Sequence, residues 1–343
     1  MQLNEKEWLP FKIESLFNIG KGIYLNKKDI HQGMSPYITA SASNNGITRF
    51  IGNDTLFDED TITIEKVKLT AFYQPTKYYC SHDVSVVSSE KLNKFNAIFT
   101  ASMINRQGDK YSYGRQAQLN VVKRETVFLP VHKVDNVQPD WQFMEDYTQQ
   151  LIQAKKQLYI AYCKQELAKL TYKEVLPLEQ KEWGEFFIEN IFTIQRGKRL
   201  TKESQITGQK PYVSSTAMNN GVDDFIGNDD GVRIFDNCLT IANSGSVGSS
   251  FYHPYNFVAS DHVTHLKNIS ISKFAYFFIA SMLNRLSEKY NFNREINDKR
   301  IKREKILLPM TQDKQPDYAY MEQYMINLEY QKRSHYLNYI QQK

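Results

Sequence analysis

The chain carries one pattern of residues twice, and this internal repeat constrains its fold more than any other feature. Glu7-Trp8 recurs as Glu182-Trp183, and the turn Asn44-Asn45-Gly46 recurs at the same spacing of 175 residues. The block 95–106 recurs as 274–285 at a spacing of 179, so the second copy gained four residues, which we place between Asn228 and Ser260. Self-similarity at a fixed spacing indicates a duplicated structural unit. We therefore expect two copies of one domain.

A long segment without glycine follows each copy and predicts a helix. The first begins after Pro139-Asp140 and the second after Pro316-Asp317. In the first, apolar residues at 144, 147, 151, 154, 158 and 161 alternate steps of three and four, the narrow stripe of a helix that packs against another helix. At about 1.5 Å per residue each helix would be about 40 to 46 Å long. We expect the two to pair as an antiparallel coiled-coil spacer between pseudo-two-fold-related domains.

Within each copy, the sequence predicts an α+β fold. Short β-rich runs at 37–39, 61–64 and 126–129 are bounded by Gly, Asn and Asp, and 11–17 resembles a strand that enters a turn. The block 95–106 has apolar residues at helical spacing. Trp8 and Trp183 are expected to anchor the two cores. The predicted boundaries are 1–136 for the first domain, 137–172 for its helix, 173–314 for the second domain and 315–343 for the last helix.

Several classes of protein are disfavoured by what the sequence lacks. It has no apolar run of 18 residues and no signal-like N-terminus, so we expect a cytoplasmic protein without a membrane partner. Ser81-His82-Asp83 contains the residue types of a hydrolase triad, but neighbours on a strand cannot converge on one atom, so we interpret it as a turn. His262, His265 and Cys238 lack a fourth ligand at suitable spacing for a metal. We expect a chain without catalytic residues, metal or cofactor.

Positive charge is distributed unevenly and in matching places. The net charge is only +5, yet 106–133 and 285–305 each carry four more basic than acidic residues. A further cluster without acidic residues consists of Arg196, Lys198, Arg199 and Lys202 in the second copy; it is matched more weakly by Lys21, Lys27 and Lys28 in the first. Matching basic faces on two repeats fit a long, roughly two-fold ligand, and duplex DNA is the obvious candidate.

The basic segments after each 12-residue block also contain side chains able to recognise bases. Arg, Gln and Asn grip base edges with forked donors and acceptors, whereas tyrosine stacks or contacts phosphate. The candidates are Lys110, Tyr111, Tyr113, Arg115, Gln116 and Gln118 in the first copy, and Arg294, Asn297, Lys299 and Arg300 in the second. Ser246, in a Gly-rich loop without a phosphate-binding lysine, is a further candidate for the DNA backbone. The alternative is that these are ordinary solvated loops.

The duplicated layout resembles a known family. Two variable domains, each with a segment like 114–120, a Leu-Pro (129–130 and 308–309) and then a long helix, resemble the specificity subunits of type I restriction-modification systems. The signatures Trp8/Trp183, Asn-Asn-Gly and Phe-Ile-Gly-Asn (50–53 and 225–228) resemble those of the type IIB, BcgI-like systems. The resemblance covers nearly the whole chain.

This resemblance implies two target recognition domains, each binding one half of a bipartite, asymmetric DNA site across a gap set by the helices. It implies partner methyltransferase or fused restriction-methyltransferase subunits, which use S-adenosylmethionine and Mg²⁺ for adenine methylation and cleavage. The chain lacks the Asn-Pro-Pro-Tyr type motif of adenine methyltransferases. Two other classes stay open: a protein-binding scaffold, which would show no salt-dependent affinity for DNA, and a self-contained endonuclease, which would cleave DNA with metal alone.

Overall fold

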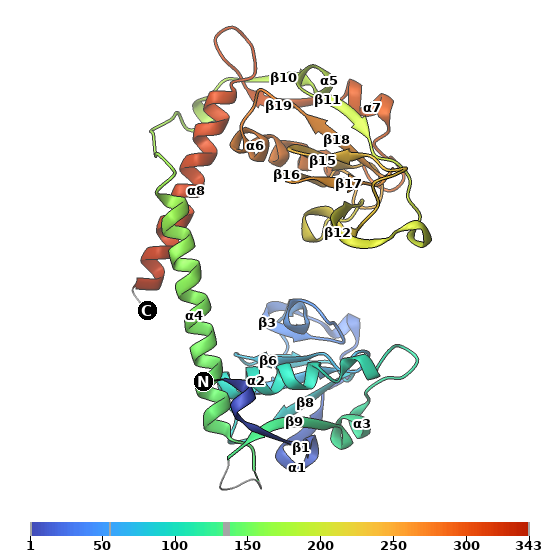
Figure 1. Ribbon diagram of the computed structural model, residues 1–343, viewed down its shortest axis with the longest axis vertical. Helices are drawn as coiled ribbons and strands as arrows, with labels where there is room; N and C mark the ends of the chain where they lie inside the picture. The colour runs from blue at the N-terminus through green and yellow to red at the C-terminus, as the bar shows by residue number, and fades with distance from the viewer. Residues whose placement is uncertain (1, 55, 133–137, 342–343) are drawn as a thin grey trace. The chain divides into compact units, whose positions relative to one another are not determined.

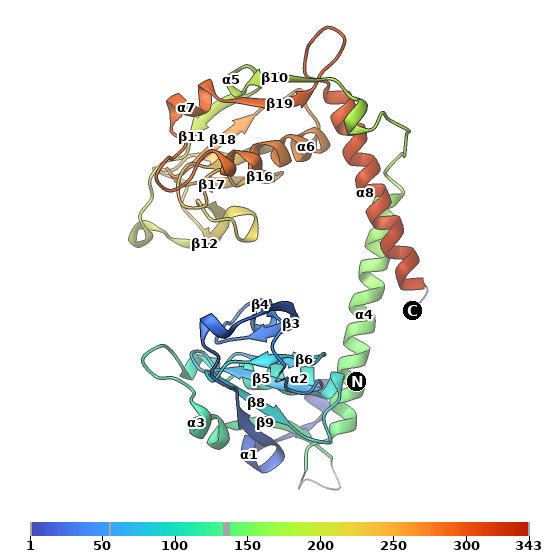
Figure 2. The ribbon, with the colours of Figure 1, turned by 180° about the vertical axis from the view of Figure 1, so that it is seen from behind.

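The protein is described by a computed structural model that covers residues 2–54, 56–132 and 138–341 (Figures 1 and 2). The chain divides into two compact units, Met1–Tyr159 and Ile160–Lys343. Each unit holds one copy of the repeated domain, and α4 (Trp141–Leu167) extends from the first unit into the second. The predicted boundary between 136 and 137, and Lys133 of the basic segment, lie outside the described residues.

The first domain mixes three small sheets with helices, which agrees with the predicted combination of strands and helices. The strand orders are β1-β9, β2-β8-β5-β6 and β4-β3-β7. The strands are β1 (Glu7–Lys12), β2 (Asn18–Lys21), β3 (Gln32–Ile38), β4 (Ile47–Ile51), β5 (Thr61–Glu65), β6 (Ala71–Gln74), β7 (Tyr79–Cys80), β8 (Val84–Ser88) and β9 (Thr126–Val131). The helices are α1 (Ile13–Leu16), α2 (Lys94–Asn105) and α3 (Leu119–Arg124), with short 3₁₀ turns η1 (Leu3–Glu5), η2 (Lys27–Asp29), η3 (Asn44–Gly46) and η4 (Gly108–Lys110).

The second domain repeats this plan, with orders β10-β19, β11-β18-β15-β16 and β13-β12-β17-β14. Its strands are β10 (Trp183–Phe187), β11 (Thr193–Arg196), β12 (Thr207–Val213), β13 (Val222–Ile226), β14 (Ile234–Phe235), β15 (Cys238–Ala242), β16 (Ser250–His253), β17 (Phe257–Ala259), β18 (Val263–Lys267) and β19 (Lys305–Pro309). Its helices are α5 (Ile188–Ile191), α6 (Lys273–Asn284), α7 (Asp298–Arg303) and α8 (Tyr318–Gln341), with turns η5 (Leu178–Gln180), η6 (Lys202–Ser204), η7 (Asn219–Gly221) and η8 (Arg285–Glu288).

The core of the first domain lies between the sheet β2-β8-β5-β6 and α2. The core of the second lies between the equivalent sheet, β11-β18-β15-β16, and α6. Trp8 stacks on Phe99 of α2 with ring centroids 6.1 Å apart, and Trp183 faces Phe278 of α6 at the same distance. Each indole Nε1 donates to a backbone carbonyl five residues earlier, at 3.1 Å in both copies. The prediction that both tryptophans anchor a core is confirmed, because burying a ring of this size against a helix contributes heavily to packing.

The structure makes two details of the sequence interpretation more precise. The segment 13–16 is a short helix, not part of a strand, because the chain turns where the backbone N–H of Ile13 donates to Glu125 O at 3.0 Å. The four extra residues of the second copy lie between Asn228 and Ser260, as expected, and are divided between two places. Two lie between β13 and β15, where the second copy forms the additional strand β14, and two lie in the loop 243–249 between β15 and β16.

The terminal strands of each domain pair with each other and close it at the base of its long helix. Trp8 lies opposite Pro130, and Trp183 lies opposite Pro309. Asp140 and Asp317 then begin the long helices, each accepting a hydrogen bond at 3.0 Å from the N–H three residues later. A carboxylate at this position satisfies an orphan donor and suits the positive end of the helix. The first and last residues of each domain therefore lie side by side.

The predicted apolar stripe of the first long helix is not buried along its length. Leu151 and Leu158 are 47% and 65% exposed. Burial is found at the two ends of α4: Met144 is 0% exposed in the core of the first domain, and Cys163, in the second unit, is 1% exposed. There the Arg333 guanidinium lies 5.1 Å from the Tyr162 ring. In the part of the chain that the structure describes, no helix is both long enough and apolar enough to cross a membrane.

Candidate nucleic-acid interface

In each domain, polar loops lie together at one end of the sheet that contains β2 or β11. In the first domain, strand pairing places Lys21 at the end of β2 beside Ser85, and Glu65 at the end of β5 beside Val84. The segment that leads into α3 joins this end, because the N–H of Ala117 donates to Lys66 O at 2.7 Å. We call this end of the sheet the loop end. It brings together residues that are far apart in sequence.

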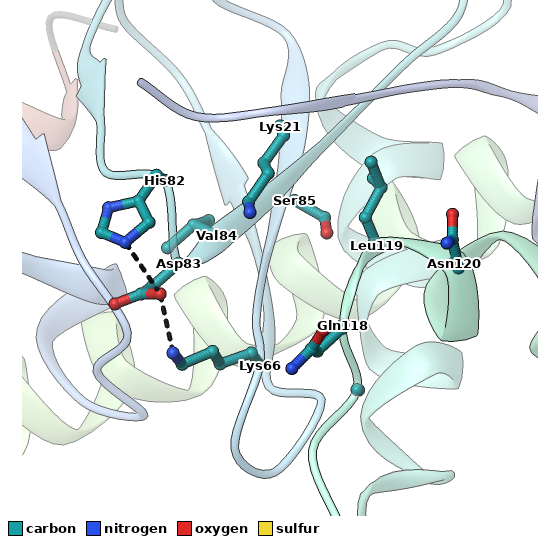
Figure 3. A pocket seen from close by; sticks show the side chains of 10 residues that line it. Lys21, Lys66, His82, Asp83, Val84, Ser85, Gln118, Leu119 and Asn120 are labelled. Atoms are coloured by element: carbon teal, nitrogen blue, oxygen red, sulfur yellow. Dashed lines mark hydrogen bonds and ion pairs between the residues drawn. The ribbon is translucent and has the colours of Figure 1, made fainter. Parts of the chain in front are cut away.

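A pocket of about 310 Å³ opens at the loop end of the first domain (Figure 3). Its polar wall comes from β2, the β5–β6 loop, the β7–β8 turn and the start of α3; the residues include Lys21, Lys66, His82, Asp83, Gln118 and Asn120. Gln118 stands at the N-cap of α3, but its side chain does not cap the helix and instead lines the pocket. Its amide is thus available to a ligand at this position.

The turn 81–83 is a structural turn that also shapes this pocket. The N–H of Val84 donates to Ser81 O at 3.0 Å, which closes the turn and confirms the interpretation from sequence. Asp83 Oδ1 lies 2.7 Å from Lys66 Nζ and 3.4 Å from His82 Nε2. These three residues do not form a hydrolase triad, because the buried Ser81 Oγ makes no hydrogen bond to His82.

Glycine is required where the chain leaves the sheet beside this turn. A Cβ at Gly22 would lie 2.1 Å from Ser81 O, and a Cβ at Gly197 would lie 2.1 Å from Ser260 O. No side chain fits at such a separation, which explains why both copies have glycine here. Because the chain packs so closely against this turn, the lysine-rich segment 21–28 and its counterpart 196–202 begin at the loop end.

The second domain has the same loop end with different side chains. Arg196 replaces Lys21; its Nε donates to Asp261 O, and its Nη1 lies 3.9 Å from Asp298 Oδ1. The N–H of Ile296 donates to Asn243 O at 3.0 Å, which matches the Ala117–Lys66 contact. A pocket of about 520 Å³ lies nearby and is lined in part by Arg199, Lys202, Asp223, Asp224, Asp261 and His262. Acidic side chains outnumber basic ones in this lining, whereas the first pocket has Lys21 and Lys66 against Asp83.

His262 and His265, considered above as metal ligands, have other partners. His262 Nδ1 lies 2.6 Å from Ser244 Oγ, whereas His265 Nδ1 lies 2.9 Å from Gln195 O and its ring stacks on Phe235 at 4.2 Å. Burial lowers the pKa of His265, which favours the neutral ring. Among the described residues, no group of three His, Cys, Asp or Glu is arranged to hold a metal ion.

Lys110 and Tyr111 both have a partner within the first domain. Tyr111 is only 9% exposed and its hydroxyl donates to Glu125, while Lys110 Nζ donates to the same carboxylate at 2.8 Å. Burial, followed by the hydrogen bond to Glu125, raises the pKa of Tyr111 to about 12. Tyr290, Lys289 and Glu304 make the same cluster in the second domain. We call each trio the Lys-Tyr-Glu cluster and assign it to holding the loop.

The other predicted residues of the first domain lie mostly at the surface. The exposed ones are Lys21, Lys27, Lys28, Tyr113, Arg115 and Gln118, and Gln116 is partly exposed. Lys21 and Gln118 meet in the pocket, whereas Lys27 and Lys28 lie in η2, outside its lining residues. Arg115 and Tyr113 belong to a turn in which the N–H of Arg115 donates to Ser112 O at 2.9 Å.

In the second domain, several of the predicted DNA-binding residues also make hydrogen bonds within the domain. The exposed ones are Lys198, Arg199, Lys202, Arg294, Asn297, Lys299 and Arg300. Asn297 caps α7 by accepting from the N–H of Arg300 at 2.9 Å, and Arg300 Nη1 donates to Glu295 O. Ser246 is partly exposed in a loop fixed by its N–H, which donates to Ser215 O at 2.9 Å. Arg196 and Ser246 are thus the most constrained of the set.

Sequence reasoning missed three residues at these ends. Lys66 forms an ion pair with Asp83, and Arg233 donates to Arg196 O at 2.6 Å. Both contacts join residues far apart in sequence, so no local pattern indicates them. Phe292, in contrast, had a signal in the sequence: it occupies the position of Tyr113 at the repeat spacing of 179. The comparison between copies could have identified it.

The fold and these loop ends define a chain with two copies of a mixed α/β domain, each followed by a long helix and each presenting exposed basic and amide side chains. The family model of the type I restriction modification DNA specificity domain matches residues 5–160 and 180–335. The chain belongs to this family, with one such domain in each half, and is a specificity subunit of a restriction-modification system.

Individual relatives agree with this assignment. The chain is 30% identical over 333 residues to the type II restriction enzyme specificity subunit S.BcgI of Heyndrickxia coagulans, covering 94% of this chain and 95% of that one. It is 23% identical over 267 residues to the putative type I specificity subunit S.MpnORF507P of Mycoplasma pneumoniae, covering 72% and 70%. The crystal structure of a type I S subunit from M. genitalium shares the fold, with a TM-score of 0.50, 15% identity and coverage of 100% and 93%.

Proposed function

We propose that this subunit recognises a bipartite, asymmetric duplex DNA site, with one half bound at the loop end of each domain. The observation that carries the proposal is the duplicated loop end itself: the same backbone contacts recur in both domains, but the exposed side chains differ. Gln118 lines the first pocket, whereas its counterpart Asn297 caps a helix. One scaffold with two sets of side chains is suited to two different half-sequences.

The proposed contacts are the exposed residues of the predicted set. Lysines and arginines at the surface neutralise phosphates and release counterions, so affinity falls as salt rises. In the first domain these are Lys21, Lys27, Lys28 and Arg115; Gln116 and Gln118 are the candidates for base edges. We leave Lys110 and Tyr111 out of the interface because Glu125 holds both.

The long helices form the spacer in this proposal and dock the partner subunits. Exposed Leu151 and Leu158 on α4 are apolar side chains that a partner helix or subunit would cover. We propose that the helices pair as an antiparallel spacer whose length sets the gap between half-sites. The chain itself is non-catalytic in this scheme; methyltransferase or fused restriction-methyltransferase partners supply adenine methylation with S-adenosylmethionine and cleavage with Mg²⁺.

The test is selection from a random duplex library by the purified full-length chain, with and without the methyltransferase of its own system, at two salt concentrations. The expected result is a motif of two unlike halves at a fixed gap, with weaker binding at higher salt. Absence of any enriched motif in both mixtures would contradict the proposal and favour a protein-binding scaffold.

A further inference from the structure

Each domain has one aromatic side chain that is almost fully exposed to solvent, at equivalent positions of the repeat. Tyr113 is 84% exposed and Phe292 is 78% exposed, and each follows the first residue of a four-residue turn, 112–115 or 291–294, that we call the tip loop. A single exposed apolar residue is common and needs no explanation. The same exposure at the same place in two diverged copies is a different matter, because little else in the tip loops is shared.

The tip loops are rigid enough to aim these rings. In the first, Ser112 and Arg115 exchange backbone hydrogen bonds at 3.2 and 2.9 Å; in the second, Asn291 and Arg294 do so at 3.3 and 2.9 Å. The N–H of Asn293 also donates to the Asn291 side chain at 3.0 Å, which tightens the second turn. A ring on a pre-ordered turn loses little conformational entropy on binding.

Each tip loop is also fixed at both of its ends. The Lys-Tyr-Glu cluster holds the start, through Glu125 in the first domain and Glu304 in the second. The contacts of Ala117 with Lys66 O and of Ile296 with Asn243 O hold the other end to the sheet. The anchoring contacts recur at equivalent positions in both copies, with identical Lys, Tyr and Glu, whereas the tips share only the aromatic ring and the arginine. Only the tip is therefore free to vary with the ligand.

The charge beside the rings indicates what they contact. Arg115 and Arg294 occupy equivalent exposed positions two residues after each ring, and the Arg294 guanidinium lies 5.2 Å from the centre of the Tyr290 ring, next to the start of its tip loop. Aromatic rings flanked by arginine match a nucleic acid, whose bases stack on the ring while phosphates pair with the cation. A protein partner would be favoured by an apolar surround, which these polar turns lack.

We propose that Tyr113 and Phe292 are wedge residues, each of which inserts its ring at a base step of its own half-site and partly unstacks it. The inference rests on the proposed DNA recognition and goes beyond it, since recognition by loops and basic residues does not require a wedge. Apolar and aromatic wedges of this kind exchange stacking energy of the DNA for a locally deformed duplex that contacts more protein.

The test uses the full-length chain and the bipartite duplex obtained by selection, in a series of duplexes that place 2-aminopurine at successive positions of the first half-site or of the second. Binding of the unaltered chain should raise the fluorescence at one step in each half, because unstacking relieves quenching. Tyr113→Ala should abolish the rise in the first half only, and Phe292→Ala in the second half only. Each substitution should weaken binding by about 5- to 150-fold, the range for losing one base–ring stack.

Two controls separate a wedge from other roles. Tyr113→Phe keeps the ring and should retain the fluorescence rise, and Ile269→Ala removes an equally exposed apolar side chain, 86% exposed, that follows β18 at the opposite end of the sheet from the tip loop. The unchanged half-site reports that each variant is folded.

Three outcomes overturn the proposal. One is normal affinity of Tyr113→Ala and Phe292→Ala, and another is a bound duplex with no unstacked step in either half. The third is loss of methyltransferase binding by these variants with intact DNA binding, which would assign the rings to a protein interface. In all three the chain still binds bipartite DNA, so DNA recognition survives. If no DNA is bound at all, the proposed function fails together with the wedge.

Discussion

The junction between the first domain and α4 provides a prediction whose size follows from the structure. Lys6 Nζ lies 2.6 Å from Asp140 Oδ2 and 4.7 Å from the centre of the Phe143 ring, and the two charged side chains are only 19% and 11% exposed. The second domain has the same arrangement with Lys181, Asp317 and Tyr320, at 2.7 and 4.9 Å. Lys6→Met removes the charge and keeps most of the side-chain length.

The expected cost is the sum of two contacts. A hydrogen bond to a charged group contributes about 1.5 to 3 kcal/mol, and a cation–π contact adds about 0.5 to 1 kcal/mol. In Lys6→Met, Asp140 still accepts the hydrogen bond from the N–H of Phe143 and still lies at the positive end of the helix. Both interactions limit the free-energy penalty for its unpaired charge. We expect the start of α4 to open more easily by about 2 to 4 kcal/mol, close to the lower part of the range for a broken buried ion pair.

Hydrogen exchange of backbone amides 143–147 in the intact chain measures this opening. Lys6→Met should speed exchange there by roughly 30- to 900-fold, which is the same free energy expressed as a rate ratio, and leave residues 320–324 unchanged. Lys181→Met should do the reverse. Adding Asp140→Asn to Lys6→Met should recover part of the loss, because the buried charge is gone and the amide still caps the helix. A change below about twofold, or equal changes in both domains, would refute the reasoning.

The same contact has a definite dependence on pH. Burial alone would raise the pKa of Asp140, but hydrogen bonds from Lys6 and the N–H of Phe143 outweigh it and lower this pKa. A carboxyl with a lowered pKa in the folded state stabilises the protein above its unfolded pKa of about 3.9 and loses this contribution as the carboxyl protonates. The difference between wild type and Lys6→Met should therefore be full at pH 7 and shrink as the pH falls below about 4.

Three further outcomes are expected. Arg115→Ala combined with Gln116→Ala should weaken or relax selection of one half-site only, measured by repeating the library selection; equal losses in both halves would argue against modular recognition. Glu125→Gln should slacken the first tip loop and reduce affinity for that same half-site, with the other half as the internal control, whereas an unchanged affinity would mean the cluster does not hold the loop. Four residues inserted after Lys155 add about 6 Å and roughly 40° of helical rotation, so the preferred gap should change or binding should be lost; an unaltered gap would exclude α4 as the spacer.

The repeat made much of the fold predictable from sequence. Two copies at a fixed spacing imply one domain folded twice, and the turn Asn44-Asn45-Gly46 could be placed because Asn and Gly tolerate positive φ; Asn45 has a φ of 55°. The stretch 13–17 was harder. Its apolar residues suit a strand, but the carbonyl of Glu125, more than a hundred residues away, ends β1 there and a helical turn follows.

The sequence indicated which loops are exposed and basic, but not which of their side chains already have partners within the domain. Lys110 and Tyr111 have the residue types of a DNA contact, and nothing local indicates that Glu125 will take both. The comparison of copies does distinguish them, because Lys, Tyr and Glu are the same in both domains while the tip loops differ. The candidates for base edges, Gln116 and Gln118, are replaced by Glu295 and Asn297 in the second copy, as expected of side chains that contact different half-sequences. Lys66 and Arg233 had no such signal.

The most direct test of the account exchanges one domain for the other. Because Trp8 pairs with Pro130 and Trp183 with Pro309, residues 183–309 can be replaced by a second copy of residues 8–130 at matching positions of the two terminal strand pairs. Library selection with this hybrid, in parallel with the unaltered chain, then shows which domain determines the sequence of each half-site. The account predicts that both halves of the selected motif carry the sequence previously found in the first half. A second half that keeps its original sequence would contradict the claim that each domain recognises its own half of the site.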